Sequence, residues 1–167
     1  NIHEAVDMWL NDEVQAEDTY GHISEWDVSS VTDMNNLFVD ASSFNGDISA
    51  WDVSSVTNMD SMFDGASSFN GDLSAWDVSS VTDMNQMFAW SPFNGDLSSW
   101  DVSSVVTMSQ MFYAASSLNT DLSTWDVTSV TNMYNMFGNS SSFNGDLSSW
   151  NVSSVTTIQS MFEGASS

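Results

Sequence analysis

The sequence predicts an α/β solenoid: a leucine-rich-repeat-like, right-handed stack of coils with short parallel strands and an N-terminal helical cap. The main observation is a unit of about 25 residues that recurs through the chain, with its tryptophan at Trp26, Trp51, Trp76, Trp100, Trp125 and Trp150. Within each unit, one segment has apolar residues at helical spacing and another alternates apolar with polar residues. A unit this short cannot bury its apolar side alone, so neighbouring units must stack.

The first segment, residues 1–20, is expected to be a helical cap. Ile2, Val6, Trp9 and Leu10 share one helical face, which suits a helix that covers the first coil. Residues 21–167 are then expected to form the repeat solenoid of about six 25-residue coils. The chain begins at Asn1 without an initiator methionine or a signal-like segment, which predicts a processed N-terminus or an excised fragment.

The second half of a unit is expected to be a short helix. In the unit that spans Phe44–Ala66, apolar residues fall at the spacing of helical turns: Val56, Met59, Met62, Phe63 and Ala66. Ser54 and Ser55 precede them as N-cap candidates. The spacing therefore predicts two or three helical turns with one buried stripe.

The first half of a unit is expected to contain a short strand near Asp47–Ser49, after the turn sequence Asn45-Gly46. Columns of equivalent apolar residues form the predicted core: Ile48, Leu73, Leu97, Leu122 and Leu147; Val53, Val78, Val102, Val127 and Val152; Met59, Met84, Met108, Met133 and Ile158; Phe63, Phe88, Phe112, Phe137 and Phe162. One unit is a residue short around Trp90 and Pro92, which predicts a local distortion of the outer turn.

The charge is one-sided, because the chain has 23 acidic residues, no lysine and no arginine, for a formal net charge of −23. Nucleic acids and anionic membranes both need cations on the protein, so neither is an expected partner. The lack of cysteine removes disulfides and zinc–thiolate sites. No apolar run reaches the ~18 residues that membrane insertion needs.

Two columns of aspartates recur with the coils. The first contains Asp47, Asp72, Asp96, Asp121 and Asp146, and the second contains Asp27, Asp52, Asp77, Asp101 and Asp126. Stacked carboxylates repel one another, and two remedies are open: each aspartate accepts backbone N–H bonds within its own turn, or the column binds calcium. Asn151 ends the Asp27 column and favours the turn role there, whereas the Asp47 column is a candidate calcium ladder. His22 occupies the first place of the Asp47 column and argues against an obligatory metal.

Catalysis is not expected, and no catalytic residue is assigned. A general acid–base pair needs one unique constellation of unequal groups, but here each carboxylate recurs in the same surroundings. His3 and His22 are the only histidines, and both lie in or beside the expected cap. No cofactor other than calcium is implied.

Serines and threonines form further columns, which include Ser49, Ser74, Ser98, Ser123 and Ser148, and Thr32, Thr57, Thr82, Thr131 and Thr156. A regular face of hydroxyl and carboxylate groups is one way to bind a glycan or ice. Asn139 and Asn151 each begin a glycosylation sequon, so they are candidate glycosylation sites of an extracellular protein.

The recurring pattern F-N-G-D-[LI]-S-x-W-D-V-S-S-V-T-x-M-x-x-M-F, from about Tyr20 to Ser167, resembles the surface-protein repeat of mycoplasma lipoproteins and of BspA-like leucine-rich surface antigens. The lead-in from Ile2 to Trp26 also resembles the helical segment found before the first repeat in that family. The resemblance implies a secreted or surface-attached protein with a non-catalytic role in adhesion, recognition or assembly.

We therefore expect an extracellular structural or adhesive protein that self-associates or binds a cell-surface protein or glycan. One form of this expectation is a surface filament assembled head to tail, in which the last coil of one chain contacts the cap of the next. The candidate assembly residues are Val6, Trp9, Leu10, Ile158, Met161 and Phe162. The alternative is a glycan- or ice-binding module that acts through its face of serine, threonine and aspartate ladders.

Overall fold

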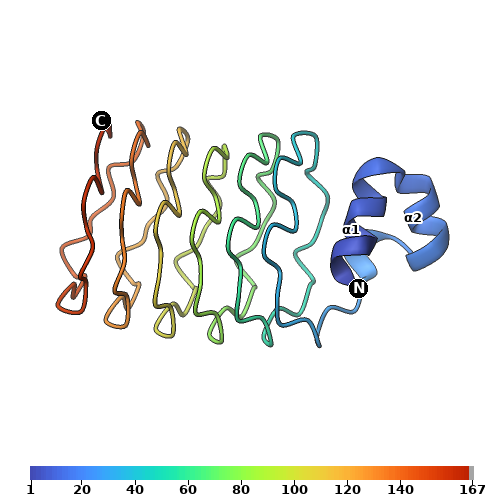
Figure 1. The fold of residues 1–167 in the computed structure, drawn as a ribbon, viewed down its shortest axis with the longest axis horizontal. Coiled ribbons are helices and arrows are strands. Elements are labelled where there is room, and N and C mark those ends of the chain that lie inside the picture. The colour runs from blue at the N-terminus through green and yellow to red at the C-terminus, as the bar shows by residue number, and fades with distance from the viewer. Residues whose placement is uncertain (166–167) are drawn as a thin grey trace.

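The structure is a computed structural model that describes residues 1–165. The chain winds into coils that lie side by side along one long axis, with two helices at the N-terminal end (Figure 1). Helix α1 spans Ile2–Asn11, helix α2 spans Glu13–Tyr20, and the 3₁₀ helix η1 spans Ile23–Glu25. The last two residues of the expected repeat region, 166–167, lie outside the described residues.

Helix α1 covers the first coil. The Asn1 side chain accepts the N–H of His3 at 3.1 Å and caps the start of α1, and Val6 and Trp9 are buried against the coil. Helix α2 buries only Ala16, and Gly21 ends it with a φ of 79°. The cap therefore packs on the coils through one of its two helices.

The coils contain neither of the elements that the sequence predicts for them. Among residues 1–165, no helix follows η1 and no run of bridges is long enough to form a strand. Neighbouring coils instead share isolated parallel bridges, which link Asp33, Asn58, Asp83, Thr107, Asn132 and Thr157 in sequence. The prediction of an α/β, leucine-rich-repeat-like solenoid built from parallel strands is therefore wrong.

The segment with helical spacing, Val56–Ala66, is a run of tight turns rather than a helix. Ser61 and Gly65, four residues apart, have φ values of 57° and 69°, which interrupt a right-handed helix. Alternate N–H groups, those of Met59, Ser61, Phe63 and Gly65, bond to carbonyls of the next coil at 2.8–2.9 Å. The N–H groups between them, those of Met62, Asp64 and Ala66, bond three residues back. Consecutive turns thus give the same inward spacing as a helix.

The expected strand at Asp47–Ser49 is also a turn. The Asp47 carboxylate accepts the Ser49 N–H at 3.0 Å and the Ser49 hydroxyl at 2.7 Å. Here the coils are joined by side chains: Asn45 Oδ1 accepts the N–H of Asn70, and the Trp51 indole donates to the Ile23 carbonyl. We call residues 44–56 and their equivalents the turn half of a coil, and residues 57–66 and their equivalents the ladder half.

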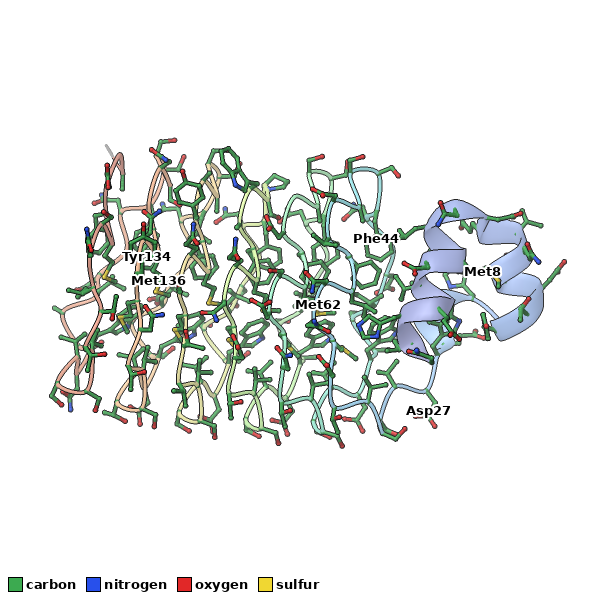
Figure 2. The ribbon with its side chains drawn as sticks, viewed as in Figure 1. Met8, Asp27, Phe44, Met62, Tyr134 and Met136 are labelled. Atoms are coloured by element: carbon green, nitrogen blue, oxygen red, sulfur yellow. The ribbon has the colours of Figure 1, made fainter. Side chains whose placement is uncertain are left out.

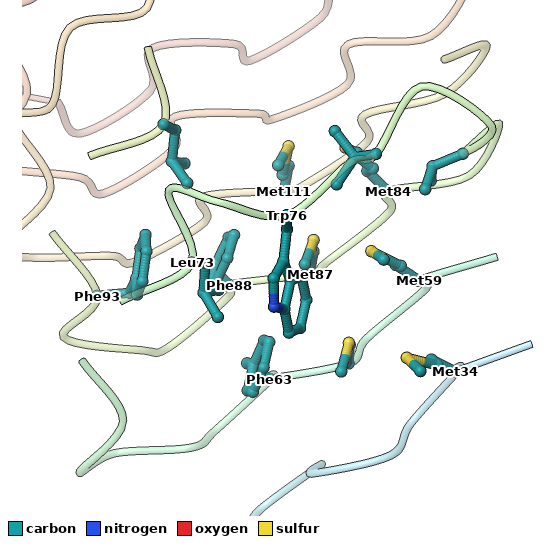
Figure 3. Close-up of a cluster of buried hydrophobic side chains, with 14 of the residues drawn as sticks. Met34, Met59, Phe63, Leu73, Trp76, Met84, Met87, Phe88, Phe93 and Met111 are labelled. Carbon is teal, nitrogen blue, oxygen red and sulfur yellow. The ribbon is translucent and has the colours of Figure 1, made fainter. Parts of the chain in front are cut away.

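The core lies between the two halves. The rings of Phe63 and Phe88 stack at 5.6 Å, and the indole of Trp76 lies beside this stack and donates to the Ile48 carbonyl at 3.2 Å (Figure 3). The predicted core columns are confirmed by burial up to the fifth coil. In the last coil Val152, Ile158 and Phe162 are exposed.

Candidate recognition surface

The aspartate columns shape the turns. Asp27 lies at one long edge of the stack, along which side-chain oxygens follow one another from coil to coil (Figure 2). Asp52 is typical, because its carboxylate accepts the Ser54 hydroxyl at 2.6 Å and the Ser54 N–H at 3.1 Å. Such bonds, chiefly from the hydroxyl and then from the N–H, hold the pKa below its ordinary value at Asp27, Asp47, Asp52, Asp72, Asp77, Asp96, Asp121 and Asp126. At Asp146 the same two bonds act, with that from the Ser148 N–H the larger.

The turns formed by the Asp47 column affect its interpretation as a candidate calcium ladder, because they already engage its carboxylates. Each aspartate of the Asp47 column has an oxygen engaged by the residue two positions later. In the part of the chain that the structure describes, no three histidine, aspartate or glutamate side chains gather closely enough to hold a metal ion. The His22 ring lies near Asp47 and favours its charged form. The column therefore has a turn-forming role that needs no metal.

The threonine hydroxyls are engaged with the preceding coil. Thr57, Thr82 and Thr156 each donate to a backbone carbonyl of the coil before at 3.1–3.2 Å. The Ser49 and Ser54 hydroxyls donate to their own aspartates. On the expected face of serine, threonine and aspartate ladders, these hydroxyl groups thus donate to hydrogen bonds within the protein.

Both histidines have structural partners in or beside the cap. The Nε2 atom of His3 lies 2.9 Å from the Asn35 carbonyl of the first coil. The equivalent carbonyl of the second coil, that of Asp60, accepts the N–H of Asn36, so His3 takes the place of a preceding coil. The Nδ1 atom of His22 lies 2.7 Å from the Ser24 hydroxyl oxygen, and the His22 ring makes an edge-to-face contact with the Trp9 ring. Sequence reasoning missed the role of His3.

The candidate assembly residues do not form two open ends. Val6 and Trp9 are buried against the first coil, so their assignment to an assembly surface is wrong, because α1 uses them as the cap. Leu10 is 37% exposed. At the last coil Met161 is buried, whereas Ile158 and Phe162 are each 50% exposed.

The two candidate glycosylation residues are exposed. The Asn139 side-chain N–H₂ donates to the Tyr113 hydroxyl at 3.1 Å, and the Asn151 side chain accepts the Ser153 N–H at 3.1 Å. Asn151 thus repeats the turn of the aspartates above it in the column. Glycosylation of both residues stays a prediction.

The outward side chains of the ladder half form a surface that sequence reasoning missed. We call it the outer face, and it consists of the residues equivalent to Asp60, Ser61, Asp64 and Gly65 in each coil; among them Ser61, Ala89 and Gly138 are buried, and the others are at least partly exposed. Its residues, coil by coil, are Asn35, Asn36, Val39 and Asp40; Asp60, Ser61, Asp64 and Gly65; Asn85, Gln86, Ala89 and Trp90; Ser109, Gln110, Tyr113 and Ala114; Tyr134, Asn135, Gly138 and Asn139; Gln159, Ser160, Glu163 and Gly164. The chemistry of this face changes from coil to coil, whereas the turn half repeats.

Aromatic side chains mark the middle of the outer face. Trp90 is 60% exposed, and its ring makes an edge-to-face contact with the Tyr113 ring, with 5.3 Å between the two ring centroids. Gly65 and Ala114 hold the equivalent positions in the coils on either side, so small residues flank the indole. Trp90 does not belong to the repeated tryptophan column. That departure from the repeat was the feature of the sequence that could have identified it.

Acidic side chains mark the first coils of the outer face. Partial burial, followed by repulsion from Asp83, raises the pKa of Asp60. Partial burial, followed by repulsion from Asp40 and then Asp60, raises the pKa of Asp64. The chain has no lysine or arginine that could relieve this repulsion.

Two hollows of about 440 Å³ each lie where the cap meets the first coil. One is lined in part by Leu10, Glu13, His22, Asn45 and Asp47, and the other in part by Ile2, Tyr20 and Trp26. Neither hollow touches the outer face. No helix within residues 1–165 has the length and apolar character to cross a membrane.

Comparison with known proteins gave one match. A family model described as "Mycoplasma protein of unknown function, DUF285" matches residues 8–92 and again residues 89–167. The mycoplasma part of the resemblance is confirmed, but the BspA-like leucine-rich part is not. The search of curated proteins and the search of solved structures found no match.

Proposed function

The chain belongs to the DUF285 family of mycoplasma proteins of unknown function, and we propose that it is a non-catalytic, extracellular recognition protein that holds a partner on its outer face. In this proposal the stacked coils are a rigid support, and the side chains of the ladder half provide specificity. The protein would act as an adhesive surface module.

The observation that carries the proposal is the exposure of Trp90. The tryptophans of the four inner coils, Trp51, Trp76, Trp100 and Trp125, are each 3% exposed, whereas Trp90 is 60% exposed beside Tyr113. Exposed tryptophan and tyrosine are the residues that most often dominate the binding energy of protein interfaces. An exposed aromatic pair on the one face whose chemistry changes from coil to coil supports recognition there.

A non-catalytic role agrees with the state of the ionisable groups. Both histidines are engaged within the cap region. The aspartates of the turn half recur in equivalent turns, so none is distinguished as a general acid or base. Head-to-tail assembly is not part of the proposal, because α1 buries Val6 and Trp9 on the first coil.

The test is an attachment assay with the full chain. Beads coated with the protein would be applied to a panel of immobilised extracellular-matrix proteins and glycans. We expect attachment to at least one surface, and its loss in Trp90→Ala. Tyr20→Ala is the matched control, since Tyr20 is an exposed aromatic residue of the cap. Equal attachment of the Trp90→Ala and parent beads would reject the proposal.

A further inference from the structure

We infer that the outer face binds a neutral glycan, with a sugar ring stacked on the indole of Trp90 and sugar hydroxyl groups bonded to the amides of Gln86 and Gln110. This inference rests on the proposed function and names the class of its ligand. It follows from the geometry of the aromatic pair, from the two amides in the same coils and from the lack of charge on this part of the face.

Trp90 and Tyr113 form an open aromatic corner. Their rings are inclined at 78°, with 5.3 Å between the ring centroids. A stacked pair covers one face of each ring, whereas an edge-to-face pair covers a face of only one of them. Trp90 is 60% exposed, so its indole offers solvent a large apolar surface on which a flat ring can stack.

The neighbouring coils hold this corner in place. The Tyr113 hydroxyl accepts the side-chain N–H of Asn139 at 3.1 Å. A Cβ atom at Gly138 would lie 3.0 Å from the Tyr113 ring, so the ring rests against the fifth coil. The Trp90 N–H bonds to the Tyr113 carbonyl at 2.8 Å. Side chains that are already ordered lose little conformational entropy when a ligand binds.

Gln86 and Gln110 supply hydrogen-bonding groups in the same two coils as the aromatic pair. Both residues are half-buried, and neither amide has a hydrogen-bond partner within residues 1–165. No side-chain nitrogen or oxygen in that range is both buried and unpaired, so the two amides are open to solvent. Each amide has two N–H donors and one carbonyl acceptor, which can bond to the neighbouring hydroxyls of a sugar.

The part of the outer face that carries these groups is neutral. In the third, fourth and fifth coils its residues are amides, hydroxyls, aromatic rings and small side chains, and none is acidic, although the chain has 23 acidic residues. The acidic part ends in the second coil, where the Asp40 carboxylate covers Gly65. A cationic partner finds no counter-charge on this neutral part, and an anionic glycan would be repelled by the formal charge of −23.

A glycan matches both the ring and the amides. The C–H groups on the face of a pyranose ring are attracted to the negative face of an indole, while the hydroxyls at its rim bond to amides. Neighbouring paired backbones lie about 4.8 Å apart, so the neutral part extends about 10 Å from the third coil to the fifth, about the length of a disaccharide. An apolar protein side chain on the indole would leave the two amides without partners.

The test is a titration of the full chain with neutral hexasaccharides by isothermal titration calorimetry. The probes are cellohexaose, chitohexaose and mannohexaose, and a hexamer of glucuronic acid is the anionic control. We expect at least one neutral probe to bind and the anionic hexamer not to bind. In saturation-transfer NMR, the ring C–H protons of the bound probe should give the strongest signals. Failure of all three neutral probes to bind would overturn the inference.

Variants locate the glycan on the outer face. Trp90→Ala should weaken binding by about tenfold or more, as for a residue that dominates a contact. Ala114 shows that alanine adopts the left-handed φ of this position. Trp90→Phe keeps a ring and should retain most of the binding, and Tyr20→Ala, in the cap, should retain all of it. A binding constant unchanged in Trp90→Ala would overturn the inference.

The amides are tested by Gln86→Ala with Gln110→Ala. Loss of two hydrogen bonds should weaken binding by about fivefold or more, without a change in the midpoint of urea unfolding, because neither amide is bonded within the described residues. Unchanged binding in this variant would show that the sugar hydroxyls do not contact these amides and would reject the site as described.

The attachment assay distinguishes this inference from the proposed function. Its immobilised surfaces would be treated with periodate, which cleaves the neighbouring hydroxyls of sugars, before the beads are applied. Loss of attachment after this treatment supports the glycan. Attachment that needs Trp90 but survives periodate would leave the function standing with a protein partner and would reject the glycan. Attachment that does not need Trp90 would reject both.

Discussion

The two halves of each coil hold their neighbours in different ways. In the turn half, side chains make the connections, as when the Trp76 indole donates to the Ile48 carbonyl and Asn70 accepts the N–H of Asn94. In the ladder half, the backbone makes them, as when the N–H groups of Ser61 and Phe63 bond to the next coil. A hydrogen bond made by a side chain requires a particular residue type at that position. A hydrogen bond made by the backbone allows almost any residue type there.

This difference explains where the repeats agree and where they differ. The turn half keeps nearly the same residues in each unit, because a changed side chain would remove an inter-coil bond. The ladder half keeps only its inward methionine, phenylalanine and alanine positions nearly constant, and its outward positions range from Asp60 to Trp90. A surface that can vary without loss of the fold is suited to recognition.

The largest loss of stability is expected from a substitution that removes an inter-coil contact of the turn half. Trp76→Ala should lower the free energy of unfolding by about 3–5 kcal/mol, because it removes a buried ring and a hydrogen bond. Trp76→Phe keeps most of the ring but removes the indole donor from the Ile48 carbonyl, which still accepts the Trp51 N–H, at a cost of about 0.5–1.5 kcal/mol. Urea unfolding followed by circular dichroism measures both. A cost of Trp76→Phe close to zero would show that the hydrogen bond contributes little to the connection.

A smaller contrast should appear between single polar positions of the two halves. Asn70→Ala removes the acceptor of the Asn94 N–H and should cost about 1 kcal/mol. Tyr134→Ala, on the outer face, should change stability by no more than about 0.5 kcal/mol, because its inter-coil bonds come from the backbone. The same urea titration would contradict the comparison if Tyr134→Ala proved the more destabilising.

Much of the turn half could be predicted from the sequence. The period, the buried columns and the turn role of the aspartates follow from residue types and their spacing, since an aspartate followed two positions later by serine favours a local turn. The backbone conformation of the turn half was harder to predict from the sequence. Asp47–Ser49 alternates polar and apolar residues as a strand does, although its polar groups close a turn.

The ladder half was predicted wrongly because two structures share its pattern. Turns closed three residues back place Met59, Met62, Phe63 and Ala66 inward, as a helix would. The available signal was a second pattern, in which Asn36 and Asp40, and again Asn135 and Asn139, lie four residues apart. Asparagine and aspartate are enriched at left-handed φ, and all four residues adopt it. Serine or glutamine at Ser61, Gln86 and Gln110 hides this pattern.

The two halves should respond oppositely to pH. Bonds from Ser54 hold the pKa of Asp52 below its unfolded value, so this carboxylate stabilises the fold at neutral pH and loses that effect as the pH falls through the folded pKa. Asp52→Ala should therefore lower the melting temperature at pH 7, and the deficit should shrink below about pH 4.

Asp60 and Asp64 have raised pKa values, so their charged forms oppose folding at pH 7 and cease to do so as the pH falls through the folded pKa. Asp60→Asn with Asp64→Asn should raise the melting temperature at pH 7, and the gain should be lost by about pH 3, where both carboxyls are largely neutral in either state. Thermal melts from pH 3 to pH 8 measure both variants. A gain that persists at low pH would show that repulsion is not its cause.

The smallest effect on the melting temperature is expected from calcium, compared with other salts. The Asp47 column has its carboxylates engaged by serine, as in the pair Asp72 and Ser74, and the described residues contain no group of three metal ligands. Divalent cations should still stabilise a chain of formal charge −23 by screening its repulsion. Melting temperatures in calcium, in magnesium and in sodium chloride at matched ionic strength should therefore rise by similar amounts. A larger rise in calcium, lost in a variant with Asp72→Asn and Asp96→Asn, would show that the turn half holds a specific ion as well as its own turns.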